Sequence, residues 1–300
     1  MKKRVPVILF ILLFVVGIGF LGYPLVSSVA NNLGARNEAR VKMSETENFD
    51  NEKINQLFDE AEEYNSSLID TIILTDPFDK DSYEEIGAHY EETFNIDGDG
   101  LIGYVEIPKI NVFLPIYHGT SAEVLQKGAG HLNNTSLPVG GEGTHSVISA
   151  HSAYPARTFF DYLTDMEEGD EFYIHVLNRT LRYEVDQIKV VLPENVSDLY
   201  VVDGEDYITL LTCTPYTVNT HRLLVRGKRA EDDGGESIIH DGSVTAISSG
   251  EGSYYLLGYK ITYLTAALII GGFVLAVALI VFVIIRRNKR KSKKAVNGDD

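Results

Sequence analysis

Two long apolar runs without a single charge bracket this chain of 300 residues. The first is the 22-residue stretch Val5–Val26, and the second is the 25-residue stretch Ile261–Ile285. A helix of about 20 apolar residues is long enough to cross the hydrocarbon core of a bilayer. The pattern therefore predicts membrane helices over 5–26 and 259–285, with a folded domain between them.

Basic residues cluster outside both runs. Residues 2–4 are all basic, and seven Lys and Arg lie between Arg286 and Lys294. Because loops rich in Lys and Arg remain in the cytoplasm, both termini are expected inside the cell and the intervening domain outside. The small residues Ser28–Ala30 also resemble a signal-peptide cleavage site, so a cleaved signal peptide is the alternative to an uncleaved anchor.

The segment between the two basic clusters is strongly acidic. Residues 5–285 carry 16 Lys and Arg against 41 Asp and Glu, a net charge of −25. A surface of this sign repels phosphate backbones, so nucleic acid is not expected as a partner. The sequence contains no Walker loop, dinucleotide fingerprint or clustered Cys/His metal motif, so no cofactor and no metal are predicted.

The pattern of apolar residues changes along the intervening chain. Spacings of three and four residues between Ile54 and Leu68 predict an amphipathic helix. From Gly103 onward, short alternating stretches such as EFYIHVLNRTLRYEVDQIKVV and YITLLTC are separated by Gly, Pro, Asn and Asp. Roughly 130 residues of this pattern are typical of an all-β domain and favour a closed barrel over a βαβ fold.

Cys213 is the only cysteine in the sequence, and it ends the predicted strand YITLLTC. Without a second cysteine it is a buried small hydrophobe, an intermolecular bridge or a reactive thiol. If this strand pairs antiparallel with RLLVRGK, Cys213 faces Arg222 across about 5 Å. A permanent cation at that position could stabilise a thiolate or an oxyanion.

A thiol nucleophile also needs a base. Of the eight histidines, His151 stands out because it ends the apolar strand SVISA and opens the turn HSAYP. Its imidazole can therefore project from a rigid strand end into a groove lined by loops. These residues alone leave two interpretations open: a nucleophile with its base and cation, or a buried cysteine beside an ordinary surface arginine.

A resemblance to a known family distinguishes these interpretations. TLLTC followed by NTHR, with HSVISAH upstream, resembles the sortases, whose Thr-Leu-x-Thr-Cys strand, downstream Arg and upstream His are catalytic. YVEIPKINVFLPIYHGT, GAGHLNNTSLPVGGEGTH, TCTPYTVNTHRLLVRGKR and the C-terminal apolar run are similar to class C, the pilus-assembling sortases. The resemblance covers residues 71–229 and implies a closed β-barrel of about eight strands with short helices. It makes Cys213 the nucleophile, His151 the acid/base and Arg222 the transition-state stabiliser.

The resemblance also implies an activity. A membrane-anchored cysteine transpeptidase would cleave an LPxTG-like sorting signal between Thr and Gly and pass the resulting acyl group to a pilin lysine. Its partners would be pilin precursors and the lipid bilayer, at the plasma membrane of a Gram-positive-type bacterium. The alternatives are a housekeeping sortase that transfers to a cell-wall precursor, and a surface adhesin without catalytic activity.

The tripeptide Asp76-Pro77-Phe78 resembles the class C lid, in which an acidic residue and an aromatic two positions later occupy the active site. Pro77 stiffens the turn, so both neighbours can be presented together. Asp76 is then expected to pair with Arg222, and Phe78 to cover the Cys213 sulfur. An ordinary Asp-Pro surface turn is the alternative.

The sequence departs from the family after His151, where the family usually has Arg-Gly and this chain has Ser152-Ala153. The departure concerns the groove surface and substrate preference rather than the three catalytic positions.

In order, the predicted segments are a cytoplasmic N-terminus (1–4), a membrane helix or signal anchor (5–26), an N-terminal helical region (27–70), the lid loop and following segment (71–90), the catalytic barrel (91–230), a flexible linker (231–258), a membrane helix (259–285) and a basic cytoplasmic tail (286–300).

Overall fold

The computed structural model describes residues 49–68, 76, 78, 88–96, 98–154 and 157–230, together with short pieces of 13–42 and 246–286. Among these described residues, no helix is both long enough and apolar enough to cross a bilayer. Much of 5–26 and 259–285 lies outside the described residues, so the two membrane helices stay a prediction.

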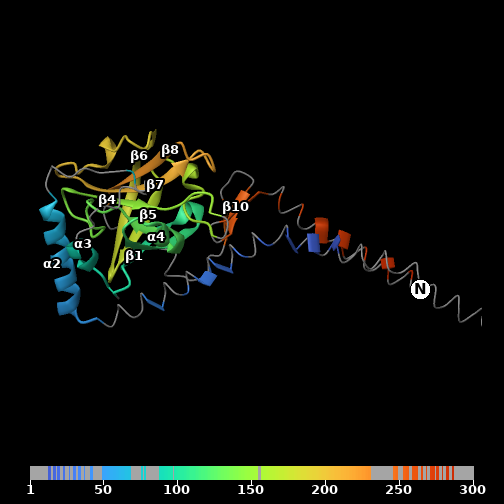
Figure 1. Ribbon diagram of the computed structural model, residues 1–300, viewed down its shortest axis with the longest axis horizontal. Coiled ribbons are helices and arrows are strands. Elements are labelled where there is room, and N and C mark those ends of the chain that lie inside the picture. Colours follow the sequence, from blue (N-terminus) through green and yellow to red (C-terminus); the bar gives the residue numbers. More distant parts are fainter. Residues whose placement is uncertain are drawn as a thin grey trace, which may run out of the picture. The chain divides into compact units, whose positions relative to one another are not determined.

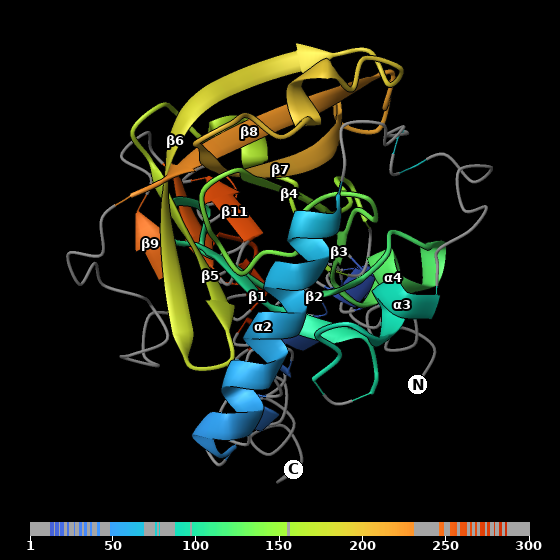
Figure 2. The ribbon, with the colours of Figure 1, turned by 90° about the vertical axis from the view of Figure 1, so that its left-hand side faces the viewer.

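Strands β1 to β8 form a closed barrel with the spatial order β1-β2-β3-β4-β7-β8-β6-β5 (Figures 1 and 2). Neighbouring strands are antiparallel except for the parallel pairs β2–β3 and β4–β7. The predicted closed all-β barrel is therefore confirmed. Its strands are β1 (Leu101–Ile107), β2 (Val112–His118), β3 (Ala129–His131), β4 (Thr144–Ser149), β5 (Glu171–Val176), β6 (Arg179–Val191), β7 (Asp206–Thr214) and β8 (His221–Arg229).

Short helices connect and cover the strands. Helix α2 (Asn51–Ser67) is the predicted amphipathic helix, and the carboxylate of Asp50 caps it by accepting the backbone N–H of Lys53 at 2.7 Å. Helix α4 (Ala122–Lys127) and strand β3 were not predicted, because both are short and lie in a stretch interrupted by glycines. The other helices are α3 (Ala88–Glu92), α4 (Ala122–Lys127) and the 3₁₀ turns η2 (Pro108–Ile110), η3 (Leu163–Asp165) and η4 (Ser197–Leu199).

Helix α2 packs its apolar face against the barrel, where it lies in front of the strands in Figure 2. The fully buried ring of Phe58 lies 5.5 Å from that of Phe94, centroid to centroid. At the end of the helix, the amide of Asn65 donates to the carbonyl of Leu137 (3.2 Å) and accepts its N–H (2.7 Å). The helix is thus fixed to the barrel immediately before the stretch that contains Asp76 and Phe78.

Three short strands follow the barrel: β9 (Ala246–Ser248), β10 (Ser253–Leu256) and β11 (Tyr259–Thr262). The first two lie in the predicted flexible linker, and the third occupies the first residues of the predicted second membrane helix. The sequence did not predict them because Gly, Ser and acidic residues dominate the stretch, and these residue types are depleted in strands.

Candidate active site

The β7–β8 hairpin pairs Cys213 directly with Arg222. Residues 207–212 of β7 and 222–225 of β8 are buried, whereas the connection 215–220 is exposed. Residues directly opposite in an antiparallel pair have Cβ atoms about 5 Å apart and share one face of the sheet. The register predicted from the sequence is therefore confirmed.

His151 reaches the same place from the other side of β7. The parallel pairing of β4 with β7 ends at Ser149 opposite Leu211. Hydrogen bonds continue this register beyond β4: Ala150 donates its N–H to the carbonyl of Leu211 (3.1 Å), and the hydroxyl of Thr212 donates to the carbonyl of Ala150 (2.7 Å). His151 follows immediately, and so comes level with the end of β7.

Two aromatic rings hold the His151 imidazole. Tyr154 stacks on it, with centroids 5.8 Å apart and planes 8° apart, and Phe159 approaches edge-on at 6.5 Å. Burial among these rings lowers the pKa of His151 below its ordinary value, because it disfavours the charged imidazolium. Sequence analysis did not single out the two aromatic residues, although both lie in the HSAYPARTFF stretch that follows the histidine.

Arg222 is 92% buried, and each nitrogen of its guanidinium donates at least one hydrogen bond. Nη1 donates to the carbonyls of Asn219 and His221, each at 3.1 Å. Nε donates to Oδ1 of Asp76 at 2.8 Å, and Nη2 donates to Oδ2 of the same carboxylate. The pair is bidentate, a geometry that combines charge-assisted hydrogen bonds with a fixed orientation.

Phe78 lies beside Asp76 and against the same site. Its backbone N–H donates to Asp76 Oδ1 at 3.3 Å. Its ring is 5.8 Å from the imidazole of His151, and the Arg222 guanidinium carbon lies 5.2 Å from the ring centroid. The structure thus has the expected Asp76–Arg222 pair. Pro77 lies outside the described residues, and the expected contact of Phe78 with the Cys213 sulfur stays a prediction.

These surroundings favour the uncharged forms of the thiol and the imidazole. Burial raises the pKa of the half-buried Cys213 thiol, and the Asp76 carboxylate raises it further, while Arg222 acts in the opposite direction. The pKa of His151 is lowered at the same time. With Asp76 bound to Arg222, both shifts therefore act against formation of a thiolate–imidazolium pair.

The departure at Ser152-Ala153 has a defined local structure. The Ser152 hydroxyl donates to the carbonyl of Cys213 at 2.7 Å, which ties the histidine loop to β7. Ala153 has a φ of +64°, in the left-handed region that a glycine adopts without a steric penalty. The chain therefore keeps the backbone conformation suited to glycine while carrying a side chain there.

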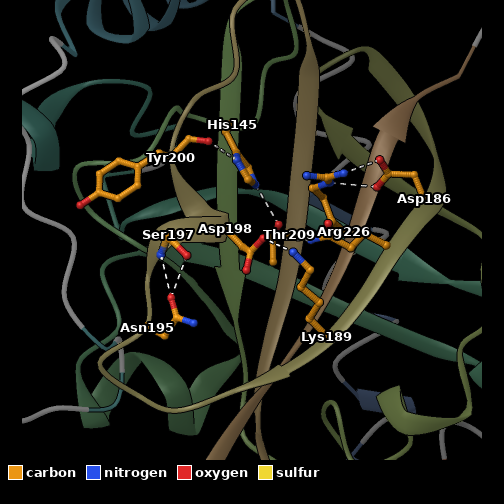
Figure 3. Close-up of polar contacts among 10 residues, drawn as sticks. His145, Asp186, Lys189, Asn195, Ser197, Asp198, Tyr200, Thr209 and Arg226 are labelled. Atoms are coloured by element: carbon orange, nitrogen blue, oxygen red, sulfur yellow. Dashed lines mark hydrogen bonds and ion pairs between the residues drawn. The ribbon is translucent and has the colours of Figure 1, made fainter.

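Other histidines of the described barrel serve its structure. His145 is buried and donates Nδ1–H to the carbonyl of Tyr200 (2.9 Å), while its Nε2 accepts the Thr209 hydroxyl (2.8 Å) (Figure 3). Burial lowers the pKa of His145 to about 4. In a separate contact drawn in the same figure, Arg226 forms a bidentate pair with Asp186. Buried hydrogen bonds similarly hold His118, His131 and His175.

The closed barrel brings one thiol, one imidazole and one guanidinium to the end of strand β7. This arrangement defines a site for acyl transfer through cysteine. Within the described residues, no group of three or more His, Cys, Asp or Glu side chains could hold a metal ion.

Comparisons with known proteins agree with this class. The Sortase domain family matches residues 105–230. Sortase D of Bacillus subtilis is 32% identical over 145 residues, which cover 47% of this chain and 70% of that protein. The pilus-related sortase C of Group B Streptococcus is 48% identical, with a TM-score of 0.57 over 63% of this chain and 95% of that one. Sortase C-1 of Streptococcus pneumoniae is 45% identical, with a TM-score of 0.59 over 62% and 94%.

The chain belongs to the sortase family of cysteine transpeptidases. The resemblance to class C deduced from its motifs is confirmed by the sortase C structures that match it at more than 40% identity.

The electrostatic arrangement predicts how the thiol responds to loss of the Asp76 charge. In Asp76→Asn, the pKa of Cys213 should fall, because the nearby negative charge is removed and Arg222 is left to stabilise the thiolate. The rate of alkylation by iodoacetamide, measured across pH, should then reach its half-maximum at a lower pH than in the parent. Asp203→Asn, which removes an exposed carboxylate, is the control and should leave the midpoint unchanged. An upward shift in Asp76→Asn would contradict the assignment.

Proposed function

We propose that the protein is a membrane-anchored class C sortase that joins pilin subunits. The observation that carries the proposal is the convergence of Cys213, Arg222 and His151 at the end of β7. The pilus-related title of the 48% identical Group B Streptococcus structure supports pilins as substrates. Curated sortases A that match the chain, such as that of Bacillus anthracis at 27% identity, are more distant in sequence.

The chemistry follows from the neutral thiol and imidazole. Once the guanidinium is free of Asp76, His151 takes the Cys213 proton, and the thiolate attacks the Thr carbonyl of an LPxTG-like sorting signal. Arg222 stabilises the oxyanion. The imidazolium then protonates the departing Gly amine, the Thr–Gly bond breaks and a thioester remains. A pilin lysine amine attacks the thioester, loses its proton to His151 and restores the thiol, which leaves an isopeptide bond.

The catalytic proposal is tested with the full chain in detergent, a sorting-signal peptide and a lysine-containing acceptor peptide. Cys213→Ala should abolish transpeptidation, while His151→Ala and Arg222→Ala should each lower it at least ~100-fold, because acid/base or oxyanion help is lost. Mass spectrometry should find the thioester on Cys213 and the isopeptide in the product.

His221→Ala, which changes the neighbour of Arg222, is the matched control and should retain parent activity. Full activity of Arg222→Ala with an unchanged circular dichroism spectrum would remove Arg222 from the mechanism. A preference for cell-wall precursor amines over lysine would instead favour the housekeeping sortase.

Asp76 and Phe78 act in this proposal as a lid on the resting enzyme. The bidentate Asp76–Arg222 pair and the position of Phe78 between His151 and Arg222 support the role. While the pair is formed, the guanidinium is not available to an oxyanion. A substrate must therefore displace the lid before it reaches the thiol, and water is kept out until then.

Removal of both side chains should make the thiol more accessible. In Asp76→Ala with Phe78→Ala, a bulky maleimide should modify Cys213 faster relative to a small alkylating reagent than it does in the parent, at one pH. The ratio of the two rates corrects for a change in the pKa of the thiol. Tyr200→Ala with Asp203→Ala removes an exposed aromatic and an exposed carboxylate, and serves as the control. An unchanged ratio in the lid variant would show that this segment is not a lid.

The basic clusters outside the two apolar runs support a topology with both termini in the cytoplasm and the barrel outside. In intact protoplasts, tags at either end of the chain should resist protease, while cleavage occurs within 231–255. An N-terminal tag lost to the medium would instead establish signal-peptide cleavage.

A further inference from the structure

The half-buried carboxylate of Asp161 lies at the base of the loop that follows His151. Its Oδ1 accepts the backbone N–H of Ala153 at 3.0 Å, and its Oδ2 accepts the backbone N–H of Phe159 at 2.8 Å. The side chain of Tyr216 also hydrogen-bonds to this carboxylate. One acidic side chain thus joins both limbs of the histidine loop to the β7–β8 connection.

Both backbone groups that Asp161 binds adjoin the rings that surround the imidazole. Ala153 immediately precedes Tyr154, whose ring stacks on His151, and Phe159 itself approaches the imidazole edge-on. A carboxylate that fixes these two N–H groups therefore fixes where both rings lie. The orientation of the His151 side chain depends on those rings.

The loop needs such a restraint because its backbone is locally unfavourable. Ala153 adopts a φ of +64°, which residues with a side chain adopt only when their surroundings hold them there. The hydrogen bond from its N–H to Asp161 supplies one such restraint. A second closes the loop, since Phe160 donates its N–H to the carbonyl of His151 at 3.0 Å.

Tyr216 extends the connection to the other two residues of the site. It lies in the segment between Cys213 and Arg222 and is 57% exposed. Its side chain hydrogen-bonds to Asp161. Asp161 is therefore linked to the loop that carries the base and to the loop that separates the nucleophile from the cation.

We infer that Asp161 is a positioning residue, which holds the His151 loop against the β7–β8 connection so that imidazole and thiol meet in a productive geometry. This inference rests on the proposed role of His151. Asp161 touches no reacting atom, so it acts on the reaction through the rings of Tyr154 and Phe159, which pack against His151. Burial raises the pKa of the carboxyl, while its hydrogen bonds to Ala153, Phe159 and Tyr216 oppose that rise.

Asp161→Asn tests the inference with almost no change in shape. One carboxylate oxygen becomes an NH₂ group, which cannot accept a backbone N–H, so one limb of the loop loses its bond. Transpeptidation should fall ~10-fold or more, because small displacements of catalytic groups are costly. The pKa of His151, followed by NMR titration and assigned by the signal lost in His151→Ala, should rise toward its ordinary value as the rings loosen. Glu168→Gln removes an exposed carboxylate between β4 and β5, the part of the chain that also contains Asp161, and should change neither quantity.

The pKa of His151 separates positioning from a merely structural role. A structural role would lower the melting temperature and leave that pKa where it is in the parent. Loss of activity with an unmoved His151 pKa would therefore overturn the inference, and so would parent activity in Asp161→Asn.

Tyr216→Phe provides a second variant that does not endanger folding, since the tyrosine is largely exposed. It removes only the hydroxyl that contacts Asp161. Like Asp161→Asn, it should lower activity and raise the pKa of His151, but each by a smaller amount. The double variant with Asp161→Asn should be no worse than Asp161→Asn alone, because both changes break one linkage. Fully additive losses would overturn the linkage through Tyr216.

Failure of this inference can be told from failure of the proposed function. If His151→Ala is inactive while Asp161→Asn behaves as the parent does, only the role of Asp161 is wrong. If His151→Ala itself keeps full activity, the proposed catalytic role of the histidine is wrong, and the positioning role is overturned with it.

Discussion

Strand β7 is paired on both sides, and the geometry of the active site depends on that pairing. Its antiparallel register with β8 places Cys213 opposite Arg222, and its parallel register with β4 brings His151 level with the same end. A shift of one residue in either pairing would turn the side chains of that strand to the other face of the sheet. Such a shift is opposed by packing on both faces of these strands, because Leu210 belongs to one buried apolar cluster and its neighbour Leu211 to another.

The bidentate pair between Asp76 and Arg222 modifies the electrostatics of a site in which burial has the largest effect. A guanidinium that faced only the thiol would favour the thiolate, whereas a guanidinium already paired with a carboxylate does so less. Burial also raises the pKa of Cys213, and it lowers the pKa of His151. With this carboxylate on the guanidinium, the surroundings therefore disfavour both the thiolate of Cys213 and the imidazolium of His151.

Much of this organisation could be predicted, and the exceptions have physical reasons. Alternating apolar residues and turn residues predicted the barrel strands, and the spacing around Phe58 predicted helix α2, because both periodicities follow from backbone geometry. Strand β3 was missed because three residues with a glycine carry almost no pattern. The cage of Tyr154 and Phe159 around His151 was missed because an aromatic residue in a loop gives no local sign of what it packs against.

The sequence by itself determined which residues could perform the chemistry and, through its motifs, the family to which the chain belongs. The sequence shows local features directly: a single cysteine at one strand end, a histidine at another and an arginine after a turn. Only the tertiary structure decided what surrounds them: the carboxylate of Asp76 on Arg222, the rings against His151 and the link through Asp161. These contacts join residues distant in sequence or set within irregular loops, so barrel closure and loop packing create them, and no periodicity in the sequence encodes them.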